Sequence, residues 1–407
     1  MILTAPRQLN LICLLCALMG IGQNTLLVSL PYLVELSDLS LSTWSIIIAV
    51  GSFLFLPSAP YWGNISDSVG PKRVVNVALI GISVSFAGIS LALYLMHDLP
   101  SIALVVILLI FRIIYGLTAS GLVPASQHWA ILLIGEDKRL EAITSVSMGL
   151  SIGRLFGPMI ASVFLLISLQ FAFIIMAIVP IFAYLLSSNW DNPVSATDKR
   201  TNDIKTVFPW KSLPYVLSGF FLCTVVALMH YSFSPLIDTI THWNTEKISQ
   251  FIAILLTIGG LLTYLAQRLI VKPKCLSLNT LFILGGALLC SGVALFLMPH
   301  IIAFIIGMAL LSLGGAFLVP AYNTYASESN KSAPGLMAGY ISMAHTLGYG
   351  FAALLTFMVA LSPTYPVIFA TMLSALILGI AVFSHSKHTT LSPLPSSLSP
   401  PNSNETK

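Results

Sequence analysis

Four polar side chains lie deep inside long apolar stretches of this sequence: Asn24, Arg112, Arg154 and His345. A guanidinium group can hold a carboxylate with two parallel hydrogen bonds. An imidazole has an ordinary pKa of about 6.5, so it can take up and release a proton at physiological pH. Together these groups could bind a small charged molecule and move a proton, provided that the surrounding elements hold them in place.

The composition indicates that those elements lie in a membrane. Hydrophobic residues make up 57% of the 407 residues and charged residues only 8%, against about 25% in a soluble domain. So few charges cannot cover a soluble surface, which excludes an ordinary soluble enzyme, a disordered chain and a nucleic-acid binder. The five cysteines are irregularly spaced, so we expect no disulfide framework and no zinc site. We also expect no other metal and no cofactor.

Twelve apolar stretches are long enough to cross a bilayer, which takes about 20 residues for one helix. The first stretch has some features of a cleaved signal peptide, but it runs on to Leu33 and is interpreted as a spanning helix. The predicted fold class is therefore an all-α membrane protein with twelve transmembrane helices. We place these at residues 11–34, 43–62, 74–96, 102–132, 142–166, 168–188, 214–237, 249–270, 277–298, 301–325, 334–361 and 364–384.

The basic residues predict the orientation, because cytoplasmic connections carry an excess of Lys and Arg. With the N-terminus in the cytoplasm, 15 of the 18 basic residues fall on the cytoplasmic side. Only Lys247 falls outside, and Arg112 and Arg154 lie within spans. We therefore expect a multi-pass protein of the inner (plasma) membrane with both termini in the cytoplasm.

The sequence repeats itself. LVPASQHWA from Leu122 resembles LVPAYNTYA from Leu318 at an offset of 196, and SMGLSIGRLFG from Ser147 resembles SMAHTLGYGFA from Ser342 at an offset of 195. Two related membrane halves are typical of transporters with a site between them at the bilayer midplane. We predict a six-helix bundle over 1–188, a cytoplasmic linker over 189–213, a second bundle over 214–385 and a disordered cytoplasmic tail over 386–407.

The loop after the second span contains a motif. It reads GNISDSVGPKR, beginning at Gly63. Gly63 permits close helix approach and Gly70 a tight turn. Asp67 can interact with a helix N-terminus or with a cation on a facing helix, and Lys72 and Arg73 favour the cytoplasmic side.

Two further motifs lie in the fourth and fifth spans. Arg112 and Gly116 stand four residues apart in RIIYG. Small residues at every fourth position form a smooth helix face for close packing, and a proline frees a backbone carbonyl and allows a bend. The fifth span has this pattern in Gly149, Gly153 and Gly157, followed by Pro158.

In order and placement these stretches resemble motifs A, B and C of the major facilitator superfamily. The loop departs from motif A at Ser68 and Pro71, where the family usually has basic residues, and motif C ends in Ala161 instead of Gly. Over about residues 11–385, the resemblance implies two pseudo-symmetric six-helix bundles and a drug:proton antiporter. It also implies that Arg112 helps in coupling and that Asp67 acts in gating.

The deep polar residues lie 11 to 13 positions into their spans, which is roughly 15–20 Å at about 1.5 Å for each residue. An ionisable group at that depth costs at least ~2.5 kcal/mol, so it usually faces water or a partner. No Asp or Glu lies at comparable depth in any predicted span. The two arginines should therefore favour an anionic substrate.

We predict that His345 and Arg112 couple protons to transport. The simpler alternatives are an arginine that bonds backbone carbonyls and a neutral, hydrogen-bonded histidine. His230 lies toward the outer end of its span and His128 toward the cytoplasmic end, so we rank both lower. The predicted substrate-binding residues are Arg154, Arg112, Asn24, Tyr115, His345, Tyr349 and Asn323.

The predicted function is a secondary transporter that moves a small organic molecule across the inner membrane, by proton-coupled export. An alternative is export or uptake of an anionic polycarboxylate such as a carboxylate siderophore. A polytopic membrane enzyme would need clustered catalytic groups, and a pump driven by ATP would need a Walker motif; the sequence has neither. A membrane sensor is a further alternative, but nothing is appended through which it could signal. We expect a monomer whose partners are its substrate, protons and lipid.

Overall fold

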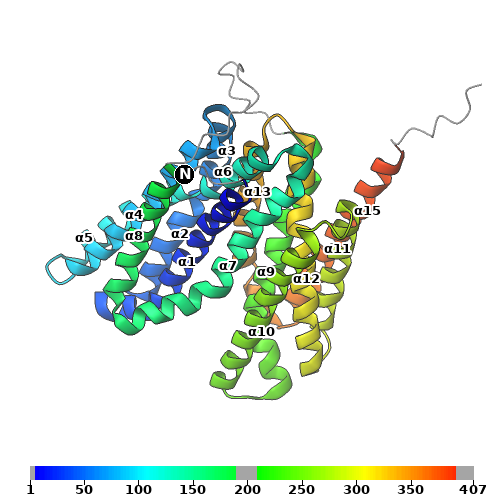
Figure 1. Cartoon of the computed structure of the whole chain (residues 1–407). Coiled ribbons are helices and arrows are strands. Elements are labelled where there is room, and N and C mark those ends of the chain that lie inside the picture. Colours follow the sequence, from blue (N-terminus) through cyan, green and yellow to red (C-terminus); the bar gives the residue numbers. More distant parts are fainter. Residues whose placement is uncertain (1–4, 189–208, 391–407) are drawn as a thin grey trace, which may run out of the picture.

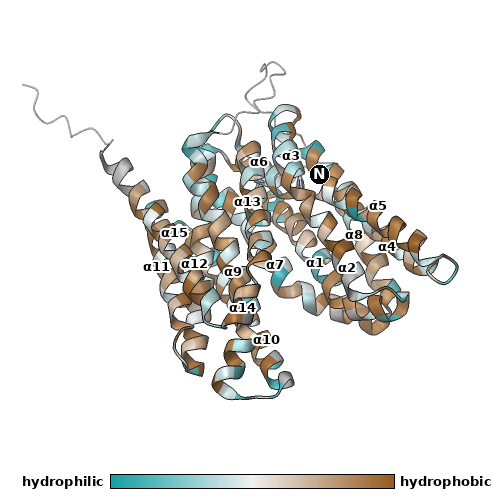
Figure 2. Cartoon of the chain, turned by 180° about the vertical axis from the view of Figure 1, so that it is seen from behind, coloured by the Kyte–Doolittle hydropathy of each residue, from teal (hydrophilic) through white to brown (hydrophobic). Residues whose placement is uncertain are grey.

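The computed structural model describes residues 5–188 and 209–390, and these residues form helices and no strand. Twelve helical segments are long and apolar enough to cross a membrane, which confirms the twelve predicted spans and the all-α fold. A helix satisfies its backbone hydrogen bonds within itself, as the bilayer interior requires. Figure 2 shows hydrophobic residues along the lengths of the helices and hydrophilic residues gathered at their connections.

The helices follow one another in two groups. The first half contains α1 (Ala5–Ser37), α2 (Leu41–Phe53), α3 (Phe55–Val69), α4 (Pro71–Tyr94), α5 (Ser101–Ala119), α6 (Leu122–Ile134), the 3₁₀ turn η1 (Glu136–Lys138), α7 (Arg139–Ile167) and α8 (Leu169–Ser188). The second half contains the 3₁₀ turn η2 (Trp210–Ser212), α9 (Leu213–Thr241), α10 (Thr245–Ala266), the π turn η3 (Gln267–Val271), α11 (Leu278–Leu295), α12 (Ile301–Ser329), α13 (Pro334–Leu354), α14 (Phe357–Leu361) and α15 (Tyr365–Thr390).

Two hydrophobic clusters form the interior. One joins buried residues between Leu9 and Ala183, and the other joins residues between Val216 and Ala381 together with Leu140. The domain boundaries at 188 and 214 stay predictions. Most of the predicted linker and the tail from 391 lie outside the described residues, and α15 runs to Thr390, inside the predicted tail.

The two halves meet at one end of the helices, here called the closed end, where α1 begins. Figure 1 shows α3, α6 and α13 meeting there, while the halves spread apart toward the opposite, open end. Among the described residues, the hydrogen bonds between the halves all lie in the part of the helices next to the closed end. They join Asp67 to Gly335 and Leu336, Gln127 to Asn323, Arg139 to Ser327, Ser151 to Gln267, and Asp137 to Lys274.

Local sequence explains the short turns at the closed end. Gly70 and Gly135 end α3 and α6 with φ of 99° and 93°, a region that favours glycine because it has no Cβ. Pro71 and Pro334 occupy the first positions of α4 and α13, where no helical N–H donor is lost. These turns bring the ends of neighbouring helices close together.

The internal repeat has a direct structural counterpart. Gln127 in α6 and Asn323 in α12 occupy equivalent positions in the repeated words at an offset of 196. Their side chains touch across the two halves, since Gln127 Nε2 lies 3.5 Å from Asn323 Oδ1. Equivalent residues of two repeats can meet in this way only beside the axis that relates them.

Candidate functional site

The motif A carboxylate joins the two halves. Asp67 in α3 accepts hydrogen bonds from the backbone N–H groups of Gly335 and Leu336, both at 2.8 Å. These groups belong to the first turn of α13, where unpaired N–H groups and the helix dipole favour a negative charge. The arrangement would let Asp67 hold α13 against α3, and its gating role stays a prediction.

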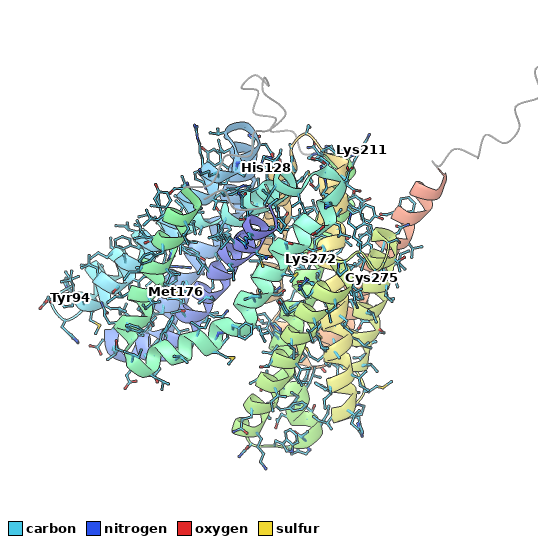
Figure 3. The ribbon with its side chains drawn as sticks, in the orientation of Figure 1. Tyr94, His128, Met176, Lys211, Lys272 and Cys275 are labelled. Carbon is cyan, nitrogen blue, oxygen red and sulfur yellow. The ribbon has the colours of Figure 1, made fainter. Side chains whose placement is uncertain are left out.

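Two further groups strengthen the closed end. His128 in α6 lies 2.9 Å from Ser66 Oγ through Nδ1 and 3.5 Å from Asp67 Oδ1, and Figure 3 shows this histidine at the closed end. Arg139, at the start of α7, is buried and donates to Ser327 of α12 and to Glu136. We ranked His128 low from the sequence because it lies toward the cytoplasmic end of its span. Its contacts with Ser66 and Asp67 join positions about 60 residues apart, so only the structure shows them.

The glycines of motif C pack α7 against α1. A Cβ on Gly153 would lie 2.5 Å from the carbonyl oxygen of Ala17, and one on Gly157 would lie 2.9 Å from Asn24 Nδ2. The close packing of α7 against α1 therefore requires glycine at these positions. Successive residues are about 100° apart around a helix, so Arg154 cannot share the face of Gly153.

Arg154 is exposed and lies near groups of the second half. Its charge acts on groups of α9, α12 and α13, and its one hydrogen bond among the described residues is a long contact of 3.5 Å from Nη2 to Ser151 Oγ. Ser151 also contacts Gln267, the hydrogen bond between the halves that lies farthest along α7. Arg154 therefore lies just beyond the last of these hydrogen bonds between the halves. The groups of the second half on which its charge acts are Cys223, His230, Tyr322, His345 and Tyr349.

The facing groups of the second half form a polar cluster. Tyr322 Oη and His345 Nε2 lie 2.6 Å apart, and Tyr349 lies beside Cys223. Tyr322 is fully buried, whereas Tyr349 is 43% exposed. His230 is also exposed. We call Arg154, His230, His345 and Tyr349, with the supporting Tyr322, the inter-half site.

Arg112 lies elsewhere, inside the first half. It is 3% exposed, its Nη2 lies 3.3 Å from the carbonyl oxygen of Ile48, and its guanidinium stacks 4.5 Å from the Tyr115 ring centroid. Gly116, one turn on, lets α5 approach α2, since a Cβ there would lie 2.5 Å from Gly51 O. The R-x-x-x-G spacing thus places the glycine and the arginine on one helix face toward α2. Within the described part of the chain, Arg112 Nε has no hydrogen-bond partner.

The remaining predicted residues are spread over three places. Tyr115 is buried beside Arg112, and its Oη lies 3.5 Å from Gln23 Nε2. Asn24 donates to its own helix at Gly20 O, 2.8 Å away, and packs against Gly157. Asn323 belongs to the closed end. The structure therefore brings together Arg154, His345 and Tyr349 and separates them from Arg112, Tyr115, Asn24 and Asn323.

No Asp or Glu of the described residues lies in the middle of a helix. Each Asp or Glu of the described residues lies in a connection or within three positions of a helix end. The described residues also contain no group of three His, Cys, Asp or Glu side chains placed to hold a metal ion. The described acidic residues are Glu35, Asp38, Asp67, Asp98, Glu136, Asp137, Glu141, Asp238, Glu246 and Glu328.

Comparison with known proteins agrees with this architecture. The family model of the Major Facilitator Superfamily matches residues 12–353. The chain belongs to this superfamily. Its family and fold are those of membrane transporters. The chain is 26% identical over 233 residues to the multidrug resistance protein MdtG of Proteus mirabilis (strain HI4320). The match covers 54% of this chain and 55% of that relative. The match thus spans about half the length of that relative.

Solved structures of other superfamily transporters show the same fold. The human organic anion transporter MFSD10 is 17% identical, with a TM-score of 0.73 over 93% of this chain and 99% of that one. FucP in its outward conformation is 15% identical, with a TM-score of 0.71 over 92% and 98%. A bacterial homologue of the iron transporter ferroportin in its outward-facing state is 16% identical, with a TM-score of 0.67 over 94% and 100%. At such identities the likeness concerns the fold alone.

Proposed function

We propose that this protein moves a small organic molecule across the inner membrane by alternating access, as a proton-coupled exporter. The observation that carries the proposal is the confinement of the hydrogen bonds between the halves to one end. Two packed halves that touch at one end can rock about a central site, so that the other end closes as the first opens. Arg154 lies at the boundary between these two regions.

The closed end is the cytoplasmic end under this proposal. Lys72, Arg73, Lys138, Lys274 and Lys331 all lie in or beside its connections. Such an excess of basic residues marks the cytoplasmic side of a membrane protein. The described conformation is then outward-facing, and both chain ends are cytoplasmic.

Two observations support a multidrug or small-molecule exporter. Motif C is built into the α1–α7 contact through Gly149, Gly153 and Gly157, and the partial relative MdtG is named a multidrug resistance protein. His345 and Arg112 are the proposed proton-coupling residues. Of the two, His345 lies in the inter-half site beside Arg154, and Arg112 packs within the first half.

The test is transport by the purified protein in liposomes with an imposed pH gradient. Citrate and the lipophilic cation tetraphenylphosphonium serve as the two probes, with an uncoupler as control. Movement of either probe that depends on the gradient supports proton-coupled transport. Failure of both probes, and of a broader set of neutral drugs, would contradict it.

Alternating access can be measured without a known substrate. Spin labels on cysteines replacing Lys138 and Lys331 report the closed end, and labels replacing His97 and Pro299 report the open end; all four residues are exposed. The five native cysteines are replaced first. We expect the two distances to change in opposite directions when the pH is changed. Distances that change together, or never, would contradict alternating access.

A further inference from the structure

The charge of Arg154 has no opposite charge near it among the residues that the structure describes. Neither ion pair of the described residues involves it, and every described Asp and Glu lies near a helix end or in a connection. Arg154 is the sixteenth of the 29 residues of α7, so it stands in the middle of its span. Such a charge is tolerated while it is exposed, as Arg154 is here, but it becomes costly without a partner once the halves close over it.

The groups that face Arg154 donate hydrogen bonds and carry no negative charge at neutral pH. Between them, Tyr322 and a neutral His345 have one O–H and one N–H, and their mutual bond uses one of the two. Tyr322 is fully buried and His345 is partly exposed, so the arrangement that leaves no buried O–H unpaired has Tyr322 donating to Nε2. The Nδ1–H of His345 is then left as a donor.

Two further donors lie on the same side of the second half. Tyr349 is 43% exposed on α13, one turn beyond His345, so the two side chains share a helix face. His230 is exposed on α9. Arg154 acts electrostatically on both of them. A ligand between the halves would thus meet a guanidinium group on one side and imidazole and phenol groups on the other.

Among the described residues, no hydrogen bond joins the halves on the open-end side of these groups. The inter-half hydrogen bond that lies farthest from the closed end joins Ser151 to Gln267, and Arg154 follows Ser151 by one helical turn. A ligand that entered from the open end would meet Arg154 before it met the hydrogen bonds that join the halves.

We propose that the inter-half site binds an organic anion through a carboxylate, which Arg154 holds with paired hydrogen bonds while His345 and Tyr349 donate to it from the second half. This inference rests on the proposed transport function and names its substrate class. A carboxylate supplies the missing negative charge and accepts hydrogen bonds from both halves. A cationic ligand would meet an arginine and no acidic group. Because the anion bonds to both halves, its binding would draw them together and favour closure of the open end.

The binding test uses wild-type protein in nanodiscs and isothermal titration. The probes are mono-, di- and tricarboxylates, citrate among them, each paired with its methyl ester, which keeps the skeleton and removes the charge. We expect at least one carboxylate to bind about tenfold or more tightly than its ester, since one charge-assisted hydrogen bond can account for such a factor. If no acid binds more tightly than its ester, the proposal is wrong.

Variants test whether the preference for the acid over its ester comes from the inter-half site. Arg154→Gln should abolish the preference for the acid, and Arg154→Lys should keep only part of it, because lysine keeps the charge but loses the paired geometry. Arg268→Gln is the matched control, since Arg268 is an exposed arginine of the second half near the closed end. Thermal unfolding checks that each variant is folded. A preference that survives Arg154→Gln in a folded protein would overturn the proposal.

The same preparations separate this inference from the proposed function. If tetraphenylphosphonium moves with the pH gradient while no carboxylate binds, transport stands and the anion site is wrong. If binding depends on Arg154 but no probe moves under any gradient, the anion site stands and the transport function is wrong.

Discussion

The backbones of Gly63 in α3 and Gly335 in α13 are in direct contact across the closed end. A Cβ on Gly335 would lie 2.6 Å from the carbonyl oxygen of Gly63 and 2.9 Å from Asp67 Oδ1. Backbone atoms cannot turn aside as a flexible side chain can. The closed end therefore requires glycine at this position.

Gly335→Ala should open the closed end. Overpacking a close contact costs about 1–3 kcal/mol, and each ~1.4 kcal/mol shifts a two-state equilibrium about tenfold. The distance between labels at Lys138 and Lys331 should lengthen. Gly315→Ala is the control, since nothing lies within 4 Å of the Cβ it would add to α12. Equal distances in both variants would show that the α3–α13 contact does not set the conformation.

Asp67→Asn should weaken the same end by a different route. The carboxylate oxygens accept one bond each from Gly335 and Leu336, whereas an asparagine amide has only one accepting oxygen. Hydrogen bonds to a charged group contribute about 1.5–3 kcal/mol. We expect a longer distance at the closed end and slower transport. Asp98→Asn, in an exposed connection of the open end, should leave both unchanged, and an unaltered Asp67→Asn protein would remove this carboxylate from gating.

Much of the fold could be predicted from the sequence because hydropathy and helix length are local properties. The twelve spans follow from runs of apolar residues alone. The repeat predicted that α6 corresponds to part of α12. In the structure the equivalent residues Gln127 and Asn323 are in contact. Glycines at every fourth position predicted a closely packed face, although only the structure identifies α1 as the helix against which it packs.

The direction of each deep side chain could not be predicted from its depth. Arg112 and Arg154 lie at similar depths, yet Arg112 is buried against Tyr115 and Arg154 is exposed toward the second half. Which way a helix faces depends on the neighbours of that helix, and those are set by packing over the whole chain. The pairing of His345 with Tyr322 has the same origin, since it needs α12 beside α13.

Replacement of Arg112 should separate its structural role from a role in coupling. Arg112→Met keeps most of the volume and removes a buried charge with no acidic partner, a change that is often neutral or stabilising. We expect the melting temperature to be unchanged or raised while proton-coupled transport is lost. Arg112→Ala leaves a cavity beside Tyr115. It should lower the free energy of unfolding by roughly the 2–5 kcal/mol of a large-to-small substitution, and with it the melting temperature. If Arg112→Met also melts much lower, the bond to Ile48 O is needed for folding.

His345→Asn should flatten the pH dependence of transport if the imidazole carries the coupling proton. Asparagine retains hydrogen-bonding capacity but does not titrate in this range. Tyr322→Phe keeps the ring and removes the hydroxyl that lies 2.6 Å from Nε2, so it should displace the pH profile without flattening it. His97→Asn, at an exposed position of the open end, is the matched histidine control. The rates are compared over a series of pH values in liposomes, with whichever probe the wild type transports. A His345→Asn profile identical to that of the wild type would leave Arg112 as the remaining coupling candidate. Because Arg112 lies inside the first half, coupling would then have to act through the packing of α2 against α5.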